Sequence, residues 1–461
     1  MELYIGDRTS IATDDRSVAM PVISSPIRPA SPGRTNGEWQ NLAAFAALKA
    51  DGSVVAWGSP YHGGDSSAVA SQLSSGVSQI FSSPGAFAAL KADGSVVTWG
   101  SPYFGGDSSA VASQLSSGVS QVFSAGYAFA ALKKDGSVVT WGANSNRDES
   151  FDHYGVGGGD SSAVASQISS GVSQIFSSLG AFAALKADGS VVTWGSSDFG
   201  GDSSAVASQI SSGVIRIFST EAAFAALKAD GSVVTWGHSE HGGDSSAVAS
   251  QISSGVSQIF STQGVFAALK ADGSVVTWGS PDFGGDSSAV ASQISSGVSQ
   301  IFSSTGAFAA LKSDGSVVTW GTIIGGDSPA VASQLSSGVS QIFSTVTAFA
   351  ALNAFAALKV DGSLVTWGAK GGDSRAVASQ ISSGVSQIFS NGYAFAALKE
   401  DGSVVAWGDL HVDYDRLLDY DANAYYGFLG YDVKAALLYP ALLGYAFLVA
   451  MVVIAAPLPA S

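Results

Sequence analysis

The chain of 461 residues contains no cysteine, which excludes disulfide bonds, thiolate zinc sites and cysteine nucleophiles. Charged residues are also scarce, at 12% against a usual share of about 25%, whereas 46% of the residues are hydrophobic. A disordered chain needs the opposite balance. The 20 basic residues are outnumbered by 36 acidic ones, and the resulting net charge of −16 argues against nucleic acid as a partner.

Glycine, in contrast, is abundant, with 56 residues, and most of them belong to a repeating unit that contains one nearly constant phrase. Its fullest form is AFAALKADGSVVTWG, which occurs in nine variants spaced 40 to 53 residues apart, and GGDS follows each of the first eight. Periods of this length are typical of propellers, solenoids and similar arrays. The tryptophans of the nine copies are Trp57, Trp99, Trp141, Trp194, Trp236, Trp278, Trp320, Trp367 and Trp407.

Each repeat predicts strands. Asp-Gly separates the apolar run AFAALKA from the β-branched run SVVTWG, which is a strong hairpin signal, and GVSQIFS supplies a strand before the hairpin. Residues 223–227 (AFAAL) are apolar on both faces, so we expect strands that are covered on both sides. The prediction is an all-β propeller of eight or nine blades with three to four strands each. The link after GGDS fits a helical turn capped by Asp202 or a short outer strand.

The phrase ALKADGSVVTWG preceded by GVSQIFS resembles the regulator of chromosome condensation repeat, and also the related bacterial beta-lactamase inhibitor protein propellers. The resemblance covers about residues 38–408 and implies blades around a ring. It implies binding functions, among them nucleotide exchange on a small GTPase, enzyme inhibition and scaffolding. In that family the DGS and WG residues are structural, so they carry no functional site.

One face of the array concentrates the variation between repeats. If the first strand of a blade runs up, the turn after it and the loop after the third strand lie on the same face, and both segments differ between copies. The alternatives for the aromatic residues of this face are a partner-binding patch and the filling of gaps between adjacent loops. The candidate binding residues are Tyr61, His62, Tyr103, Phe104, Phe151, His153, Tyr154, Phe199 and Phe283.

The sequence predicts neither catalysis nor a cofactor. No nucleophile elbow, phosphate loop or dinucleotide fingerprint is present. The repeated aspartates are interpreted as turn and cap residues, since a calcium repeat needs a shorter period. His238 and His241 lie three residues apart without a third metal ligand in view. We therefore expect a protein-binding scaffold that is not an enzyme, with an unknown protein partner, no metal and a monomeric state.

The two ends of the chain differ from the repeats. Residues 1–37 are predicted to be a disordered tail before the propeller of residues 38–408, and residues 409–434 an acidic, tyrosine-rich linker. Residues 435–457 carry no charge over 23 positions, which is long enough for a helix to span a bilayer. The alternatives are a tail anchor on a cytoplasmic protein and an apolar helix packed on the propeller.

Overall fold

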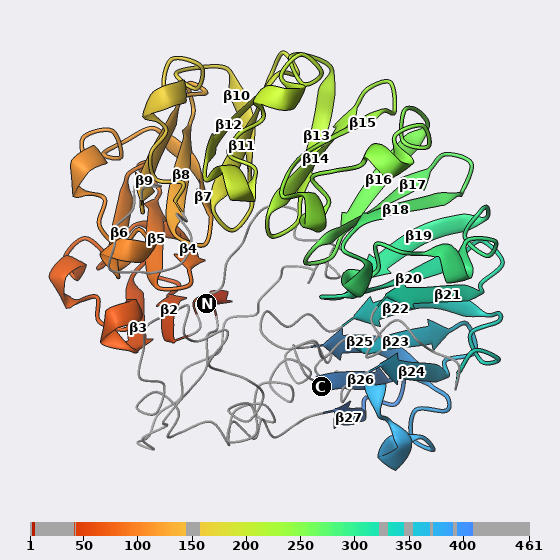
Figure 1. Ribbon diagram of the computed structural model, residues 1–461. Helices are drawn as coiled ribbons and strands as arrows, with labels where there is room; N and C mark the ends of the chain where they lie inside the picture. The colour runs from red at the N-terminus through yellow and green to blue at the C-terminus, as the bar shows by residue number, and fades with distance from the viewer. Residues whose placement is uncertain are drawn as a thin grey trace, which may run out of the picture.

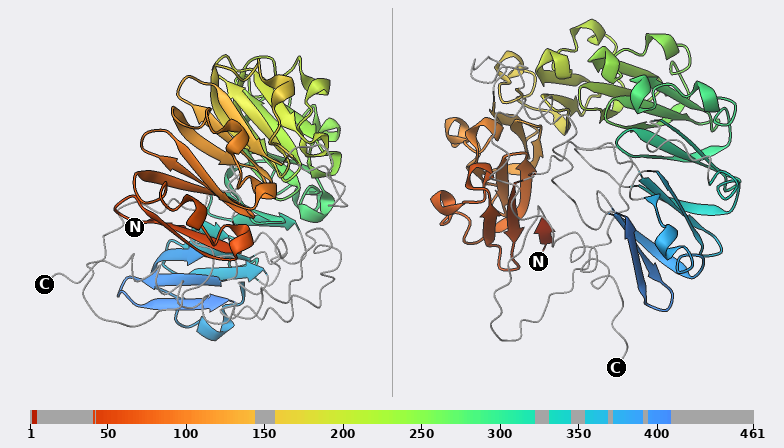
Figure 2. Two further views of the ribbon diagram at one scale, coloured as in Figure 1. Left: turned by 90° about the vertical axis from the view of Figure 1, so that its left-hand side faces the viewer. Right: turned by 60° about the horizontal axis from the view of Figure 1, so that its bottom comes forward.

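The computed structural model contains nine sheets of three antiparallel strands each. Figures 1 and 2 show these sheets side by side around an arc. The structure describes residues 2–4, 41, 43–143, 157–321, 331–344, 354–368, 372–390 and 394–408. The predicted all-β propeller-like fold is confirmed. Every sheet has three described strands, and the sheets number nine.

The strands of each sheet follow one another in chain order from the inside of the arc to the outside (Figure 1). The inner strands are β1 (Glu2–Tyr4), β4 (Val77–Ser83), β7 (Val119–Ser124), β10 (Val172–Ser177), β13 (Val214–Ser219), β16 (Val256–Ser261), β19 (Val298–Ser303), β22 (Val339–Ser344) and β25 (Val385–Ser390). The central strands are β2 (Ala44–Leu48), β5 (Ala86–Lys91), β8 (Ala128–Lys133), β11 (Ala181–Lys186), β14 (Ala223–Lys228), β17 (Val265–Lys270), β20 (Ala307–Lys312), β23 (Ala354–Lys359) and β26 (Ala394–Lys399). The outer strands are β3 (Val54–Gly58), β6 (Val96–Gly100), β9 (Val138–Gly142), β12 (Val191–Gly195), β15 (Val233–Gly237), β18 (Val275–Gly279), β21 (Val317–Gly321), β24 (Leu364–Gly368) and β27 (Val404–Gly408).

The hairpin between the central and outer strands sets the register of each sheet. In the fifth sheet, Phe224 pairs with Trp236 across β14 and β15, and their rings stack with centroids 5.4 Å apart. The Asp-Gly turn closes this hairpin, and the side chain of Asp230 accepts hydrogen bonds from the backbone N–H and the hydroxyl of Ser232. The predicted hairpin is confirmed, and the repeated aspartate is a turn residue as interpreted.

Each sheet has two different apolar faces, and the hydrophobic core lies between neighbouring sheets. In the fifth sheet, the face that we call the front face carries Ala223, Ala225 and Leu227 of the central strand. The back face of the next sheet covers them with the phenylalanine of its central strand and with Trp278 of its outer strand. The front face of each sheet therefore packs on the back face of the next sheet along the array. This packing explains why the central strands lack apolar and polar alternation, since both of their faces are buried.

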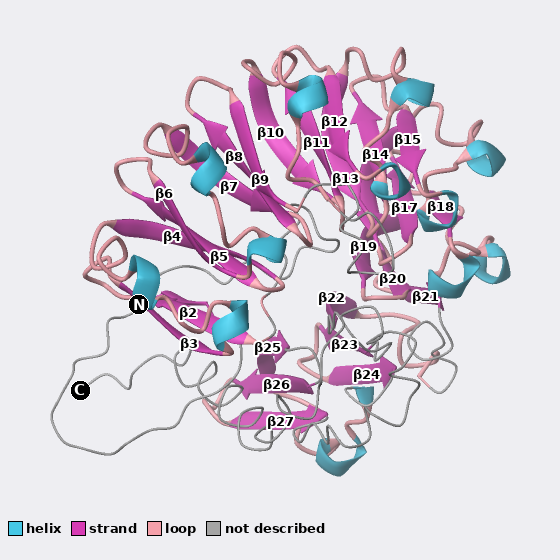
Figure 3. Ribbon diagram, turned by 60° about the vertical axis from the view of Figure 1, so that its left-hand side comes forward, coloured by secondary structure: helices cyan, strands magenta, loops and turns pink. Residues whose placement is uncertain are grey.

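In the seven links whose 3-10 turn the structure describes, the segment after GGDS forms that turn, so the outer-strand alternative is wrong there. These turns are η2 (Ser67–Val69), η4 (Ser109–Val111), η5 (Ser162–Val164), η7 (Ser204–Val206), η9 (Ser246–Val248), η11 (Ser288–Val290) and η13 (Arg375–Val377). Figure 3 shows such turns as short helices at the outside of the array. Asp202 accepts the backbone N–H of Ser204 at 2.8 Å, although the residue at the N-cap itself is Ser203.

Several predicted features lie outside the described residues. Among them are most of residues 1–37, the segment 409–434 and the apolar segment 435–457. No helix in the described part of the chain has the length and apolar character needed to cross a membrane. Within the N-terminal segment, Glu2–Tyr4 forms β1 and pairs with β2. The first sheet therefore takes its inner strand from outside the repeats.

Candidate functional site

The loops that follow five of the outer strands share one backbone shape. Each forms a 3-10 turn, and a glycine with φ between +89° and +96° ends it. A side chain at that glycine would sit in the left-handed region, which only glycine adopts at little cost. These turns are η1 (Pro60–His62), η3 (Pro102–Phe104), η6 (Ser197–Phe199), η8 (Ser239–His241) and η10 (Pro281–Phe283).

The loop after the outer strand contacts the turn between the inner and central strands of the same sheet. In the second sheet, the hydroxyl of Ser83 donates to the carbonyl of Phe104 at 2.8 Å. In the fourth, Ser178 donates to the carbonyl of Phe199 at 2.7 Å. The prediction that both segments lie on one face is confirmed. We call this surface, formed by the five turns and the adjacent inner turns, the loop face.

Backbone hydrogen bonds join the inner turns of neighbouring sheets into a row. The N–H of Leu179 donates to the carbonyl of Glu221 at 2.8 Å, and the N–H of Glu221 donates to the carbonyl of Gln263 at 3.0 Å. The side chain of Gln263 donates in turn to the carboxylate of Glu221 at 2.8 Å. In the fourth to sixth sheets, the loop face therefore rests on a main-chain support that runs from sheet to sheet.

The last residue of each loop turn points towards the protein. Phe104 is only 7% exposed and stacks on Tyr127 of the next sheet, with ring centroids 5.2 Å apart. Phe199 and Phe283 are half-buried and pack against the apolar clusters between sheets. His62 is half-buried at the same position. For Phe104, the structure favours the gap-filling alternative over direct partner contact.

The residue before this last position points outwards. Tyr61 is 80% exposed and Tyr103 is 51% exposed, and they lie on the first and second sheets. The candidates Phe151, His153 and Tyr154 belong to the insertion after the third sheet and lie outside the described residues. Of the predicted aromatic residues, Tyr61 and Tyr103 are therefore exposed on the loop face.

Sequence reasoning overlooked an acidic group at the same outward position. Asp198, Glu240 and Asp282 occupy it in the fourth, fifth and sixth sheets, and all three are exposed. The signal was present in the loops SPYH, SPYF, SSDF, HSEH and SPDF, whose third letters are Tyr, Tyr, Asp, Glu and Asp. The outward position therefore changes from aromatic to acidic along the array.

Two loop histidines are held in the neutral form. Burial lowers the pKa of His62, and burial together with the nearby His238 lowers the pKa of His241. The Nδ1 atoms of His238 and His241 lie 3.3 Å apart, so two protonated rings would repel each other. His241 occupies the inward position that phenylalanine occupies in neighbouring repeats.

This arrangement predicts that the fold is less stable in mild acid. Because the folded-state pKa values are lowered, the unfolded chain binds protons first as the pH falls through about 6.5, and stability declines there. We expect a lower Tm at pH 5.5 than at pH 7.5. The double variant His62→Phe/His241→Phe should lose most of this difference, because phenylalanine fills the same position without titrating. An equal pH dependence in the variant would show that other groups cause it.

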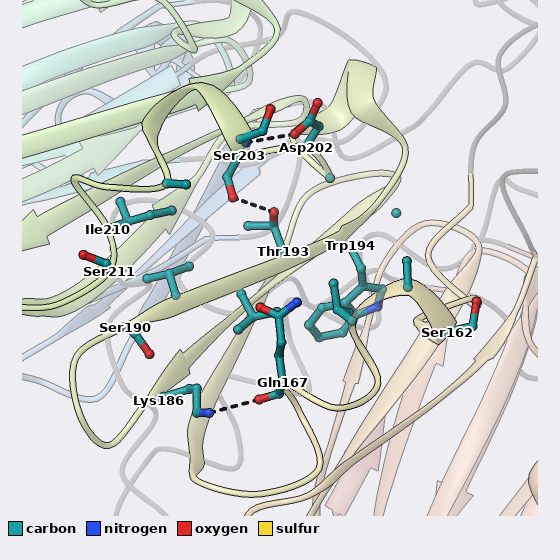
Figure 4. Close-up of a pocket in the computed structure, with 18 of the residues that line it drawn as sticks. Ser162, Gln167, Lys186, Ser190, Thr193, Trp194, Asp202, Ser203, Ile210 and Ser211 are labelled. Carbon is teal, nitrogen blue, oxygen red and sulfur yellow. Dashed lines mark hydrogen bonds between the residues drawn. The ribbon is translucent and has the colours of Figure 1, made fainter.

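A groove lined by polar and apolar side chains lies beside the outer strand β12 (Figure 4). Within it, Lys186 Nζ donates to the carbonyl of Gln167 at 3.0 Å, and Thr193 Oγ1 donates to Ser203 Oγ at 2.9 Å. The same bonds recur beside β18, where Lys270 donates to the carbonyl of Gln251 at 2.9 Å. The groove is thus a repeated structural feature in which a lysine fastens the link between sheets.

The described ranges contain no group of three or more histidine, aspartate or glutamate side chains placed to hold a metal ion. No family model and no curated protein matches the chain.

Comparison with solved structures gives matches of low similarity. Prp20p from Saccharomyces cerevisiae is 14% identical, with 62% of this chain and 82% of that chain covered and a TM-score of 0.32. The ectodomain of the Physcomitrella patens receptor kinase CR4 is 15% identical, with 61% and 70% covered and a TM-score of 0.30. Human WBSCR16 is 17% identical, with 60% and 73% covered and a TM-score of 0.29.

Proposed function

We propose that this protein is a non-enzymatic scaffold that binds a protein partner on its loop face. The observation that carries the proposal is the exposure of Tyr61 and Tyr103, at 80% and 51%, on turns whose backbone is fixed. Large aromatic side chains are enriched among the residues that dominate binding energy. Because the turns are already ordered, a partner loses little free energy in ordering them.

The exposed acidic side chains indicate the charge that the surface of the partner carries. Asp198, Glu240 and Asp282 present carboxylates in a row of neighbouring sheets beyond the tyrosines. Electrostatic complementarity raises association rates and excludes like-charged partners. The fitting partner is therefore a protein with an apolar contact surface for the tyrosines beside a basic patch.

The test is capture of partners on the immobilised full-length chain. The double variant Tyr61→Ser/Tyr103→Ser should weaken capture by about 2 kcal/mol or more, on the order of a 30-fold loss of affinity. Its thermal unfolding should match that of the wild type, because both side chains are exposed. Val360→Ser is the matched control, since this valine is 79% exposed in an Asp-Gly turn at the opposite ends of the strands.

Capture that survives the loss of both tyrosines would contradict the assignment of this face. Neutralising the acidic group with Asp198→Asn, Glu240→Gln and Asp282→Asn should slow association and reduce its dependence on salt. A captured small GTPase whose nucleotide release accelerates would instead identify the exchange-factor alternative.

A further inference from the structure

The front-to-back packing leaves one apolar face without a neighbouring sheet at each end of the array. Inside the array, the front face of every sheet contacts the back face of the next. Among the described sheets, none precedes the first, so its back face packs on no other described sheet. None follows the ninth, and its front-face cluster contains described residues of that sheet alone.

The back face of the first sheet is open along its outer strand β3. Val55 is 41% exposed, whereas the equivalent valines Val97 and Val234 are 6% and 7% exposed. Trp57 is half-buried, whereas the other repeat tryptophans are 4% or 5% exposed. The central strand is less open, since Phe45 is buried. The exposed apolar strip is therefore formed by Val55 and Trp57.

The front face of the ninth sheet is open along its outer strand β27. Val404 is 40% exposed there, and Ala406 is half-buried, while Ala396 on the central strand is buried. Position 406 is threonine in the second to eighth sheets, where, for example, Thr235 Oγ1 donates to Ser245 Oγ at 2.8 Å. Alanine at 406 removes that hydroxyl, so this strip is more apolar than the corresponding strip inside the array.

Such ends are unusual for a repeat protein that exists as separate molecules. Terminal repeats normally carry a polar outer face, because an apolar one makes the array poorly soluble. Here the terminal sheets keep Val55, Trp57 and Val404, and neither exposed strip contains a charged side chain. The two strips also have the complementary types, one front and one back, that pack together between neighbouring sheets within the chain.

We propose that the ninth sheet of one copy docks on the first sheet of a second copy, which extends the array from molecule to molecule. The contact continues the interface already present between neighbouring sheets, with Val404 and Ala406 against Val55 and Trp57. It joins two different surfaces and is therefore a head-to-tail interface, which produces rings or open chains. The proposal replaces the expectation of a monomer and is independent of the loop face, which lies at the ends of the strands.

The experiment measures the mass of the full-length chain by sedimentation over a range of concentrations. The wild type should form species at multiples of 46.3 kDa that grow with concentration. Val404→Lys blocks every front face and Val55→Lys blocks every back face, so each variant alone should remain a monomer. An equal mixture should give a 1:1 dimer, because each variant still offers the face that the other lacks. Val360→Lys, at an exposed valine outside both strips, should assemble like the wild type.

Thermal unfolding of each variant monitors folding, and Ala406→Gln replaces Val404→Lys if the lysine variant is unfolded.

Three outcomes would overturn the proposal. The wild type could stay a monomer at every concentration, which would mean that each strip is covered within its own chain. Assembly could persist in both lysine variants, which would assign it to another segment, such as the apolar residues 435–457. Only one variant could lose assembly while the other keeps it, which would indicate contact between like faces.

Discussion

Replacing Trp236 with alanine is expected to lower the free energy of unfolding by about 3–5 kcal/mol, the range for a large buried aromatic residue. The side chain is 4% exposed, stacks on Phe224 and packs against the front face of the preceding sheet. Its Nε1 atom also donates to the carbonyl of Gly200, in the loop of that preceding sheet, at 3.1 Å. The substitution therefore removes both a core side chain and a bond between sheets. Urea unfolding followed by circular dichroism measures the effect.

Trp57→Ala is the matched control for this prediction. Trp57 stacks on Phe45 in the same way, with ring centroids 5.1 Å apart, but it is half-buried and no sheet precedes it. We expect a clearly smaller loss than for Trp236. Equal losses at the two positions would mean that the stacking within a sheet, and not the packing between sheets, determines the stabilising effect of the tryptophan.

Replacing Gly231 with alanine is the second change with a large expected effect. This glycine of an Asp-Gly turn has a φ of +76°, and an added Cβ atom would lie 2.8 Å from the backbone nitrogen of Gly255 in the next sheet. The left-handed conformation costs about 1–2 kcal/mol for a residue with a side chain. The clash with a main-chain atom adds about 1–3 kcal/mol, as for other overpacked sites. The expected total is about 2–5 kcal/mol in urea unfolding.

Gly402→Ala separates these two contributions. Gly402 occupies the same turn in the ninth repeat with a φ of +82°, but its added Cβ atom would meet nothing within 4 Å. Only the conformational cost should remain, about 1–2 kcal/mol. If Gly402→Ala were as harmful as Gly231→Ala, the close approach between sheets would have no energetic consequence.

The sequence predicted the sheets well because the signals within a hairpin are local. Asp-Gly between AFAALKA and SVVTWG defines a turn and a register, and the absence of alternation predicts burial on both faces. The link was ambiguous for the opposite reason. Residues 202–207 do not by themselves distinguish a 3-10 turn from a strand. This link is fastened by Lys228, which donates to the carbonyl of Gln209, 19 residues earlier.

The placement of the variable segments on one face was predictable, because strand direction alone brings them together. The roles of the individual aromatic residues were not predictable, because Phe104 and Tyr103 are adjacent in sequence yet differ in exposure, at 7% and 51%. The shape of the 3-10 turn determines which of the two points inwards. Composition drew attention to aromatic residues, and the exposed carboxylates at the same position were therefore overlooked.

The loop turns separate the part of each repeat that maintains the fold from the part that points outwards. A glycine ends each turn, and in the fourth sheet the hydroxyl of Ser178 holds it through a main-chain carbonyl, which any residue provides. The outward side chain takes no part in that support, so tyrosine, aspartate and glutamate occupy it on the same backbone. In the proposed scaffold, these positions are interchangeable units of recognition. A new pattern of outward residues then changes specificity one residue per repeat and requires no change in the underlying architecture.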